Sequence, residues 1–214
     1  MTHLERIVIP ELLQHVTHRG RNRAAIFRDA DDHRAYRASV VYHANRNRVR
    51  IAGYVEMDNH VHFGLIVPSK AALTSFIQRL HSEHARRMNE KYGMSGPVFG
   101  GRFYSASVDM DAALEVVRYI ELNPQRAGMV ARAADYEYSS ARAHVLGVRD
   151  AIAGELWEPL RSIDNYEEWL RELSSDIGDR WAAIRQLTRR GERITKSLIL
   201  ATAGDVRALT TAQR

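Results

Sequence analysis

Two neighbouring β-strands and the turn between them are predicted by Gly53-Tyr-Val-Glu-Met-Asp-Asn-His-Val-His-Phe-Gly-Leu-Ile-Val-Pro68. The Asp58-Asn59 pair tolerates the positive φ angles of a tight hairpin turn. Side chains two residues apart in a strand point to the same face of the sheet. His60 and His62 are therefore expected to share a face, and two imidazoles on a rigid element form half of a divalent-metal site.

The segments on either side of this hairpin complete a β-α-β-β-α-β order that is followed by a further helix. We expect strands at 12–18, 51–57, 61–67 and 102–108, and helices at 30–46, 69–91 and 111–123. Ser69 is a suitable N-cap for the second helix, and Asp109 or Asp111 for the third. Pro124 prevents the third helix from continuing. This order predicts an α+β fold, a ferredoxin-like antiparallel sheet of the split βαβ type.

The strand that carries the histidines has two different faces. The apolar face consists of Val61, Phe63, Leu65 and Val67. It is expected to pack against the first two helices, which leaves the histidine face to the third. Tyr119 lies beside the apolar stripe of that third helix, and Asn123 follows four residues later on the same side. A phenol and an amide are thus expected to face the two imidazoles.

A tyrosine beside two histidines is what an enzyme needs to break a nucleic-acid backbone through a covalent phosphotyrosine. A phenol with a pKa near ~10 is a poor nucleophile at neutral pH, so a metal ion or a base must favour the phenolate. Neutral His60 and His62, together with water and phosphate oxygens, suit Mg²⁺ or Mn²⁺. Asn123 has two interpretations: its amide oxygen is a third ligand, or the residue only ends the helix ahead of Pro124.

The composition is that of a globular protein with a polyanionic partner. The chain has 214 residues, enough for one domain with an appendage or two small domains. Its net charge is +5, and only three of its 31 basic residues are lysines. Arginine suits bidentate contacts to phosphate and guanine, although a GC-rich genome would also favour arginine over lysine.

Several classes of protein are disfavoured. Without cysteine there is neither a disulfide framework nor a thiolate metal site. No apolar run approaches the length of a membrane span, and the first residues lack a signal-peptide core. We therefore expect a cytoplasmic bacterial protein with no membrane partner.

The motifs resemble those of single-tyrosine transposases. Residues 57–67 resemble the His-hydrophobic-His motif of these enzymes. Residues 101–105, 118–128 and 138–144 resemble the bacterial branch called REP-associated tyrosine transposases, and with residues 15–20 and 26–29 the likeness covers roughly residues 12–147. The resemblance implies an HUH nuclease domain that acts on single-stranded DNA beside hairpins of repeated extragenic palindromes.

Carried over to this chain, the resemblance implies that His60 and His62 bind the metal and that Tyr119 is the nucleophile. Asn123 occupies the helical position where related insertion-sequence enzymes commonly place a metal-binding glutamine, whose side chain is one methylene longer. Asp58 stands where many relatives are expected to have proline, and a turn accepts either residue.

Basic and aromatic residues near these motifs are candidates for DNA contact. They are Arg19, Arg23, Arg102, Tyr104, Arg118 and Arg126. Each arginine can instead be a solvated surface residue, and Tyr104 can pack against protein rather than stack on a base. The sequence is compatible with a monomer and with a homodimer.

The C-terminal third matches the transposases only loosely. We expect helices at 136–144, 163–173 and 179–190, and a boundary near residues 147–154. This gives a nuclease domain at 1–147 and a basic helical extension at 148–214. The leading function is DNA cleavage and strand joining, as in transposition; the alternatives are a domesticated hairpin-binding protein without catalysis and an RNA-binding or RNA-cleaving protein.

Overall fold

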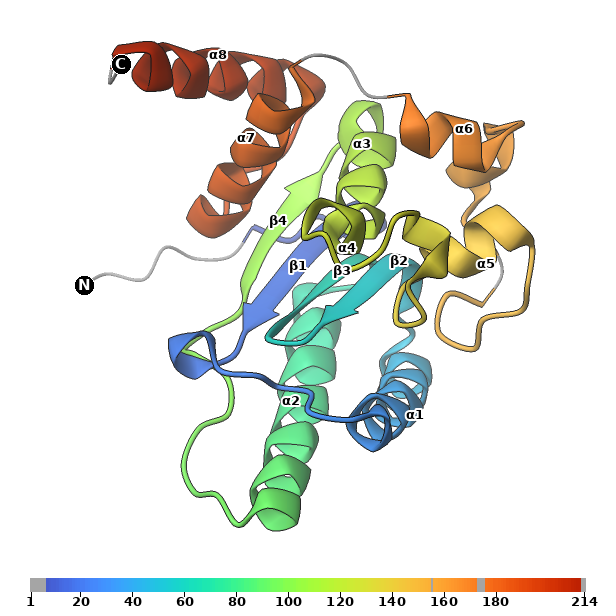
Figure 1. Cartoon of the computed structure of the whole chain (residues 1–214), viewed down its shortest axis with the longest axis vertical. Coiled ribbons are helices and arrows are strands. Elements are labelled where there is room, and N and C mark those ends of the chain that lie inside the picture. Colours follow the sequence, from blue (N-terminus) through green and yellow to red (C-terminus); the bar gives the residue numbers. More distant parts are fainter. Residues whose placement is uncertain (1–6, 155, 173–175, 213–214) are drawn as a thin grey trace.

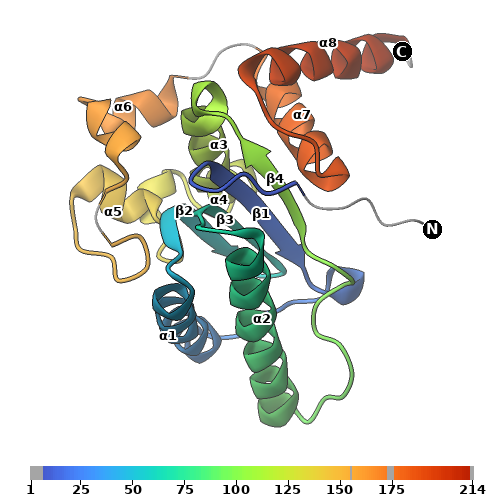
Figure 2. The ribbon, with the colours of Figure 1, turned by 180° about the vertical axis from the view of Figure 1, so that it is seen from behind.

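A four-stranded antiparallel sheet carries helices on both of its faces (Figures 1 and 2). The computed structural model describes residues 7–154, 156–172 and 176–212. The strands are β1 (Leu13–Arg19), β2 (Arg50–Met57), β3 (His60–Ile66) and β4 (Tyr104–Val108). Their order in the sheet is β2-β3-β1-β4, so the first strand of the chain lies between the third and the fourth. The predicted α+β split βαβ fold is confirmed.

The hairpin between β2 and β3 has the predicted two-residue turn. Met57 pairs with His60, which leaves Asp58 and Asn59 as the connection. The prediction for β4 was two residues too long at its start. Gly101 has a φ of +62° and forms a bend with Arg102, so extended structure begins only at Tyr104.

The apolar face of the sheet is covered by α1 (Ala30–Asn47) and α2 (Lys70–Tyr92), as predicted. Val61, Phe63 and Leu65 of β3 are fully buried there. Ser69 caps α2 by accepting a hydrogen bond from the backbone N–H of Ala72 at 3.1 Å. This layer fixes the orientation of β3 and directs its histidines to the other face.

The histidine face is covered by α3 (Met110–Glu121), whose N-cap residue is Asp109 rather than Asp111. Two glycines of the sheet allow the helix to come close. A Cβ atom at Gly53 would lie 3.1 Å from Val117 Cγ1, and one at Gly64 would lie 3.5 Å from Ile120 Cδ1. The absence of side chains at these two positions brings α3 down onto β2 and β3.

Short helices and 3₁₀ turns follow or flank these elements. They are η1 (Arg21–Arg23), α4 (Asn123–Arg126), η2 (Ala133–Asp135), α5 (Ala141–Leu146), η3 (Glu158–Ser162) and α6 (Tyr166–Arg171). The helix predicted at 136–144 was wrong in its first half. Residues 138–140 run along the edge of β2 instead, because Tyr138 O accepts from Glu56 N and Ser140 N donates to Tyr54 O.

The helix predicted at 163–173 is shorter than expected, since α6 spans six residues and Leu173 lies outside the described residues. The last two helices are α7 (Ile177–Arg190) and α8 (Lys196–Ala212). The division into domains at 1–147 and 148–214 stays a prediction. No helix in the described part of the chain is long and apolar enough to cross a membrane.

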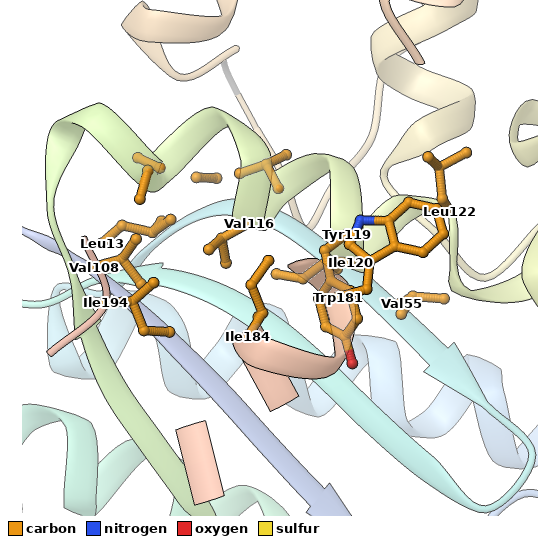
Figure 3. Packing of buried hydrophobic residues seen from close by; sticks show 14 of the residues in the cluster. Leu13, Val55, Val108, Val116, Tyr119, Ile120, Leu122, Trp181, Ile184 and Ile194 are labelled. Atoms are coloured by element: carbon orange, nitrogen blue, oxygen red, sulfur yellow. The ribbon is translucent and has the colours of Figure 1, made fainter. Parts of the chain in front are cut away.

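α7 lies on the same side of the sheet as α3 and shares its core (Figure 3). Trp181, Ile184 and Leu187 are its buried anchors. After the helix, the chain pairs with β4: Ile194 N donates to Ser107 O at 2.8 Å, and Asp109 N donates to Ile194 O at 2.8 Å. Apolar packing and these backbone hydrogen bonds together hold α7 against the sheet.

Candidate active site

The register of the sheet gathers polar side chains on the face beneath α3. In an antiparallel sheet, directly paired residues point to the same face. Thr17 pairs with both His62 and Tyr104, and Arg19 pairs with His60. His60, His62, Arg19 and Tyr104 therefore share one face, although they come from three strands.

His60 is held in the tautomer that suits a metal ligand. Its Nδ1 lies 2.7 Å from Asn59 Oδ1. Asn59 Nδ2 donates to the carbonyl of Arg23 at 3.2 Å, which leaves Oδ1 as the atom that faces the ring. Because an amide oxygen only accepts, the proton is on His60 Nδ1, and Nε2 keeps its lone pair.

His62 is in contact with a third imidazole. Its Nδ1 lies 3.0 Å from Nε2 of His15, and the two rings are stacked with centroids 5.2 Å apart. His15 Nδ1 in turn lies 2.7 Å from the hydroxyl of Thr188 on α7. Burial lowers the pKa of His15 and of His60 to about 3, and that of His62 well below 6.5. All three rings are neutral at pH 7, as metal binding requires.

Tyr119 stands over these rings from α3. Its ring centroid is 5.6 Å from that of His62 and 5.5 Å from that of His15, with both pairs nearly perpendicular. Figure 3 shows the ring packed beside Ile120 and Trp181, with its hydroxyl oxygen on the side away from α3. The residue is only 1% exposed. The structure thus brings the predicted tyrosine to the predicted histidines.

Two arginines from different helices lie near the phenol of Tyr119. Arg126 of α4 has its guanidinium carbon 5.6 Å from the centroid of the Tyr119 ring, and Arg185 of α7 acts on the phenol with its positive charge. Burial raises the pKa of the phenol, whereas the positive charges of Arg185, Arg126 and Arg189 act in the opposite direction. These guanidinium groups would stabilise a phenolate that forms in this otherwise desolvated place.

Asn123 caps the end of α3. Its Nδ2 donates to Tyr119 O at 2.7 Å and to Ile120 O at 3.2 Å. In a continuing helix Ile120 O would accept from the residue at position 124, but Pro124 has no N–H. The amide of Asn123 satisfies that carbonyl instead, and its Oδ1 is the atom left for a ligand role. The capping interpretation therefore has direct support, and it does not exclude metal binding.

These side chains line a cavity of about 610 Å³. Its lining contains five arginines, namely Arg19, Arg23, Arg126, Arg185 and Arg189. No Asp or Glu among the described residues lines it. An uncompensated cluster of guanidinium groups around two imidazoles and a phenol is suited to a phosphate-bearing ligand.

Two of the predicted DNA contacts do not line this cavity. Arg118 points to the other side of α3, where its guanidinium lies 4.1 Å from the Trp169 ring and donates to Glu172 O at 3.0 Å. Arg102 lines a separate pocket with His81 and Phe103. The other predicted contacts, Arg19, Arg23, Tyr104 and Arg126, are part of the cavity.

The structure adds residues that the sequence did not single out for the site. They are His15, Arg185, Thr188 and Arg189. The alternation of Leu13, His15 and Thr17 in β1 could have indicated that His15 shares a face with Thr17. Nothing local indicates that α7, more than fifty residues after α3, contributes to the same site.

The donor atoms fit a site with two histidines. Within the described ranges, no three His, Cys, Asp or Glu side chains are arranged to bind a metal. A third protein ligand at His60 and His62 would therefore have to be an uncharged oxygen, and the amide of Asn123 in the cavity lining offers one. Two neutral imidazoles and one amide leave several positions for water and phosphate oxygens, as Mg²⁺ and Mn²⁺ require.

Comparison with known proteins places the sheet and α3 in a known family. The model of the IS200-like transposases matches residues 9–123. The solved structure of a REP-associated tyrosine transposase bound to a REP hairpin matches with a TM-score of 0.55 at 17% identity, over 74% of this chain and 94% of that chain. A crystal structure of a putative transposase from Deinococcus radiodurans matches with a TM-score of 0.40 at 17% identity, over 56% and 96%. A search of curated proteins gave no match.

Proposed function

Because this chain belongs to the IS200-like transposase family, we propose that it cleaves and rejoins single-stranded DNA beside hairpins, with Tyr119 as the nucleophile. The observation that carries this proposal is the perpendicular contact between Tyr119 and the His62 ring inside an arginine-lined cavity. A protein that only binds DNA needs neither a phenol at a histidine pair nor two arginines beside that phenol.

In the proposed reaction the Tyr119 oxygen attacks the phosphorus of the scissile phosphodiester. The bond between phosphorus and the Tyr119 oxygen forms as the bond to the leaving sugar oxygen breaks. The phenol proton passes to solvent in the cavity, and the leaving oxygen takes up a proton from solvent to become a strand-end hydroxyl. Arg126 and Arg185 stabilise the phenolate before attack. Since a phosphodiester replaces a phosphodiester, the reverse attack by a strand-end hydroxyl can rejoin the DNA.

His60 and His62 are the proposed ligands of Mg²⁺ or Mn²⁺, with Asn123 as a candidate third ligand. A divalent ion there supplies charge neutralisation and orientation of the phosphate. The same five arginines disfavour a bare cation. We therefore propose that the ion binds best together with DNA, whose phosphate supplies negative charge and ligand oxygens.

A hairpin as substrate is supported by the fold neighbour, which was solved with a REP hairpin. A single strand beside the hairpin fits a cavity in which bases can reach Tyr104, which is 48% exposed. The exposed Arg19 and Arg23 lie at the same cavity and suit backbone phosphates.

The proposal is tested with labelled single-stranded DNA from the genomic flanks of the gene, including its hairpins, incubated with Mn²⁺. We expect cleavage that stops when EDTA is added and that is lost for a perfect duplex of the same sequence. Tight hairpin binding without cleavage would favour a domesticated binding protein, for which the near-complete burial of Tyr119 would be an explanation. Cleavage of the matched RNA hairpin alone would favour an RNA-directed function.

A further inference from the structure

A chain of hydrogen bonds connects α7 to His62. It begins at the carbonyl of Ile184, which lies 2.7 Å from the Thr188 hydroxyl oxygen. That oxygen lies 2.7 Å from His15 Nδ1, and His15 Nε2 lies 3.0 Å from His62 Nδ1. His15, His62 and Thr188 are all buried, so these groups have one another rather than bulk water as partners.

The carbonyl of Ile184, at one end of this series of hydrogen bonds, fixes which atom donates in each of them. A carbonyl oxygen only accepts, so the single hydroxyl proton of Thr188 is directed to Ile184 O. The Thr188 oxygen must then accept from His15, whose proton is on Nδ1. His15 Nε2 consequently carries a lone pair, and the proton in the contact to His62 belongs to His62 Nδ1. His62 Nε2 is left without a proton.

We infer that Thr188 and His15 are positioning residues that hold His62 in the tautomer required for metal binding through Nε2. This inference rests on the proposed metal site. Asn59 does the same for His60 from within the hairpin, through its 2.7 Å contact. A metal-bound histidine commonly donates its other ring N–H to such a partner, which fixes the ring and raises its basicity.

The position of Thr188 is rigid enough for this role. Its neighbours on α7, Ile184 and Leu187, are buried in the core shared with α3. The segment after α7 is bonded to β4 through Ile194. α7 lies outside residues 9–123, to which the family model extends. The metal site of this chain thus depends on a helix that the family match does not include.

If the direction of these hydrogen bonds were reversed, His62 could no longer bind a metal ion through Nε2. If the Thr188 hydroxyl were absent, the proton of His15 Nδ1 would lose its acceptor, and His15 would gain by moving that proton to Nε2. His15 Nε2 would then donate to His62 Nδ1, and His62 would carry its proton on Nε2. A protonated Nε2 has no lone pair for a metal.

The most direct test is the tautomer of His62 in the metal-free protein, observed by long-range ¹H–¹⁵N NMR correlation at pH 7. In the wild type we expect an unprotonated Nε2 and a protonated Nδ1. In Thr188→Val, which keeps the shape of the side chain but removes the hydroxyl, the protonated Nε2 form should appear. Thr188→Ser, which restores the hydroxyl, should retain the wild-type pattern.

The second readout is the Kd for Mn²⁺, measured with and without a single-stranded oligonucleotide. Thr188→Val should weaken binding by about tenfold, the lower end of the effect of losing such an outer partner. Thr188→Ser should bind as the wild type does. Melting temperatures separate this effect from loss of the fold.

The two readouts test the series of hydrogen bonds from Thr188 to His62 separately from the metal site. A protonated Nε2 on His62 in the wild type overturns the inference, whether or not any variant folds. A folded Thr188→Val protein with the wild-type tautomer and the wild-type Kd for Mn²⁺ overturns it as well. A third outcome is that the wild type shows the expected tautomer and Thr188→Val loses it, but neither protein binds Mn²⁺ even with DNA. In that case the hydrogen-bond series from Thr188 to His62 is supported, and the proposed metal site is wrong.

Discussion

His62 and Tyr119 come from a strand and a helix almost sixty residues apart, yet their ring centroids lie 5.6 Å apart with an interplanar angle of 88°. The contact follows from two local features. The tight turn at Asp58-Asn59 sets the face on which His62 lies, and the glycines of β2 and β3 let α3 approach the sheet. The proposed metal ligand and the proposed nucleophile are thus positioned by backbone geometry before any substrate binds.

The two histidines should be required for metal binding. His60→Ala and His62→Ala should each raise the Kd for Mn²⁺ by at least an order of magnitude, because each removes one of two strong ligands. Calorimetric titration with and without single-stranded DNA measures this. DNA should tighten binding in the wild type, since the cavity lining carries five arginines. His43→Gln is the control, because His43 lies on α1, which covers the opposite face of the sheet. An equal loss of Mn²⁺ binding in that variant would refute a specific site.

Arg126 and Arg118 form a matched pair for the DNA interface. Each guanidinium lies 4.1 Å from a tryptophan ring, but only Arg126 lines the cavity. Arg126→Gln should reduce the slope of log K against log salt by about 0.7, the value for one phosphate contact on a single strand. Arg118→Gln should leave this slope unchanged and lower the melting temperature, because it loses the bond to Glu172 O. If Arg126→Gln and Arg118→Gln gave the same slope of log K against log salt, Arg126 would not contact a DNA phosphate.

The two roles of Asn123 give different results in a substitution series. If its oxygen binds the ion, Asn123→Ala should weaken Mn²⁺ binding, whereas Asn123→Asp and Asn123→Gln should retain more of it. If it only caps α3, Asn123→Ala should cost about 1 kcal/mol of stability, as other lost helix-end contacts do, with unchanged metal dependence. Mn²⁺ titration and thermal melting of the three variants decide between these outcomes. An unchanged metal curve would leave His60 and His62 as the protein ligands.

The histidines on the opposite face of the sheet should make the protein sensitive to acid. Burial, with a contribution from His18 and His84, lowers the pKa of His81 well below 6.5, and burial lowers that of His33 to about 4. The unfolded chain therefore binds protons below pH 6.5 that the folded protein does not, and the free energy of unfolding falls as the pH falls toward these lowered values.

His81→Phe tests this linkage, because a phenylalanine keeps the stacking on Phe99, where the centroids are 4.2 Å apart. The variant should be less stable at pH 7, since it loses the contacts with Tyr36 and His18. Its stability should nevertheless decline less steeply between roughly pH 6 and 5, by up to about 1.4 kcal/mol per pH unit. Denaturant unfolding at several pH values gives the slope. A slope equal to that of the wild type would mean that His81 is protonated in the folded protein.

The sequence predicted those parts of the site that local periodicity determines. Alternation in a strand put His60 and His62 on one face, and helical spacing put Tyr119 and Asn123 on one side. The expected helix 111–123 ends earlier, at Glu121, and Asn123 and Pro124 begin the short helix α4. Arg102, a candidate DNA contact because of its charge and its motif, lies outside this cavity, and the strand expected from residue 102 begins only at Tyr104, after the bend at Gly101.

The remaining site residues depend on contacts between distant segments. His15 faces His62 because β1 lies between β3 and β4, an order that no single strand reveals. Arg185 and Thr188 reach the site because α7 packs on the sheet beside α3, and the pairing of Ile194 with β4 holds it there. Burial of Trp181 and Ile184 explains this docking, but many apolar helices would satisfy the same pattern.

Mass spectrometry of the protein–DNA adduct tests the central claim most directly. The protein is incubated with its hairpin-flanked single strand and Mn²⁺, digested with nuclease and trypsin, and sequenced by tandem mass spectrometry. Residues 119–126, which lie between two arginine cleavage sites, contain a single tyrosine. We expect a nucleotide on that peptide in the wild type and on no peptide in Tyr119→Phe, which should still bind the DNA. A nucleotide on Tyr104, Tyr136 or Tyr138, or cleavage without any adduct, would contradict the assignment of Tyr119 as the nucleophile.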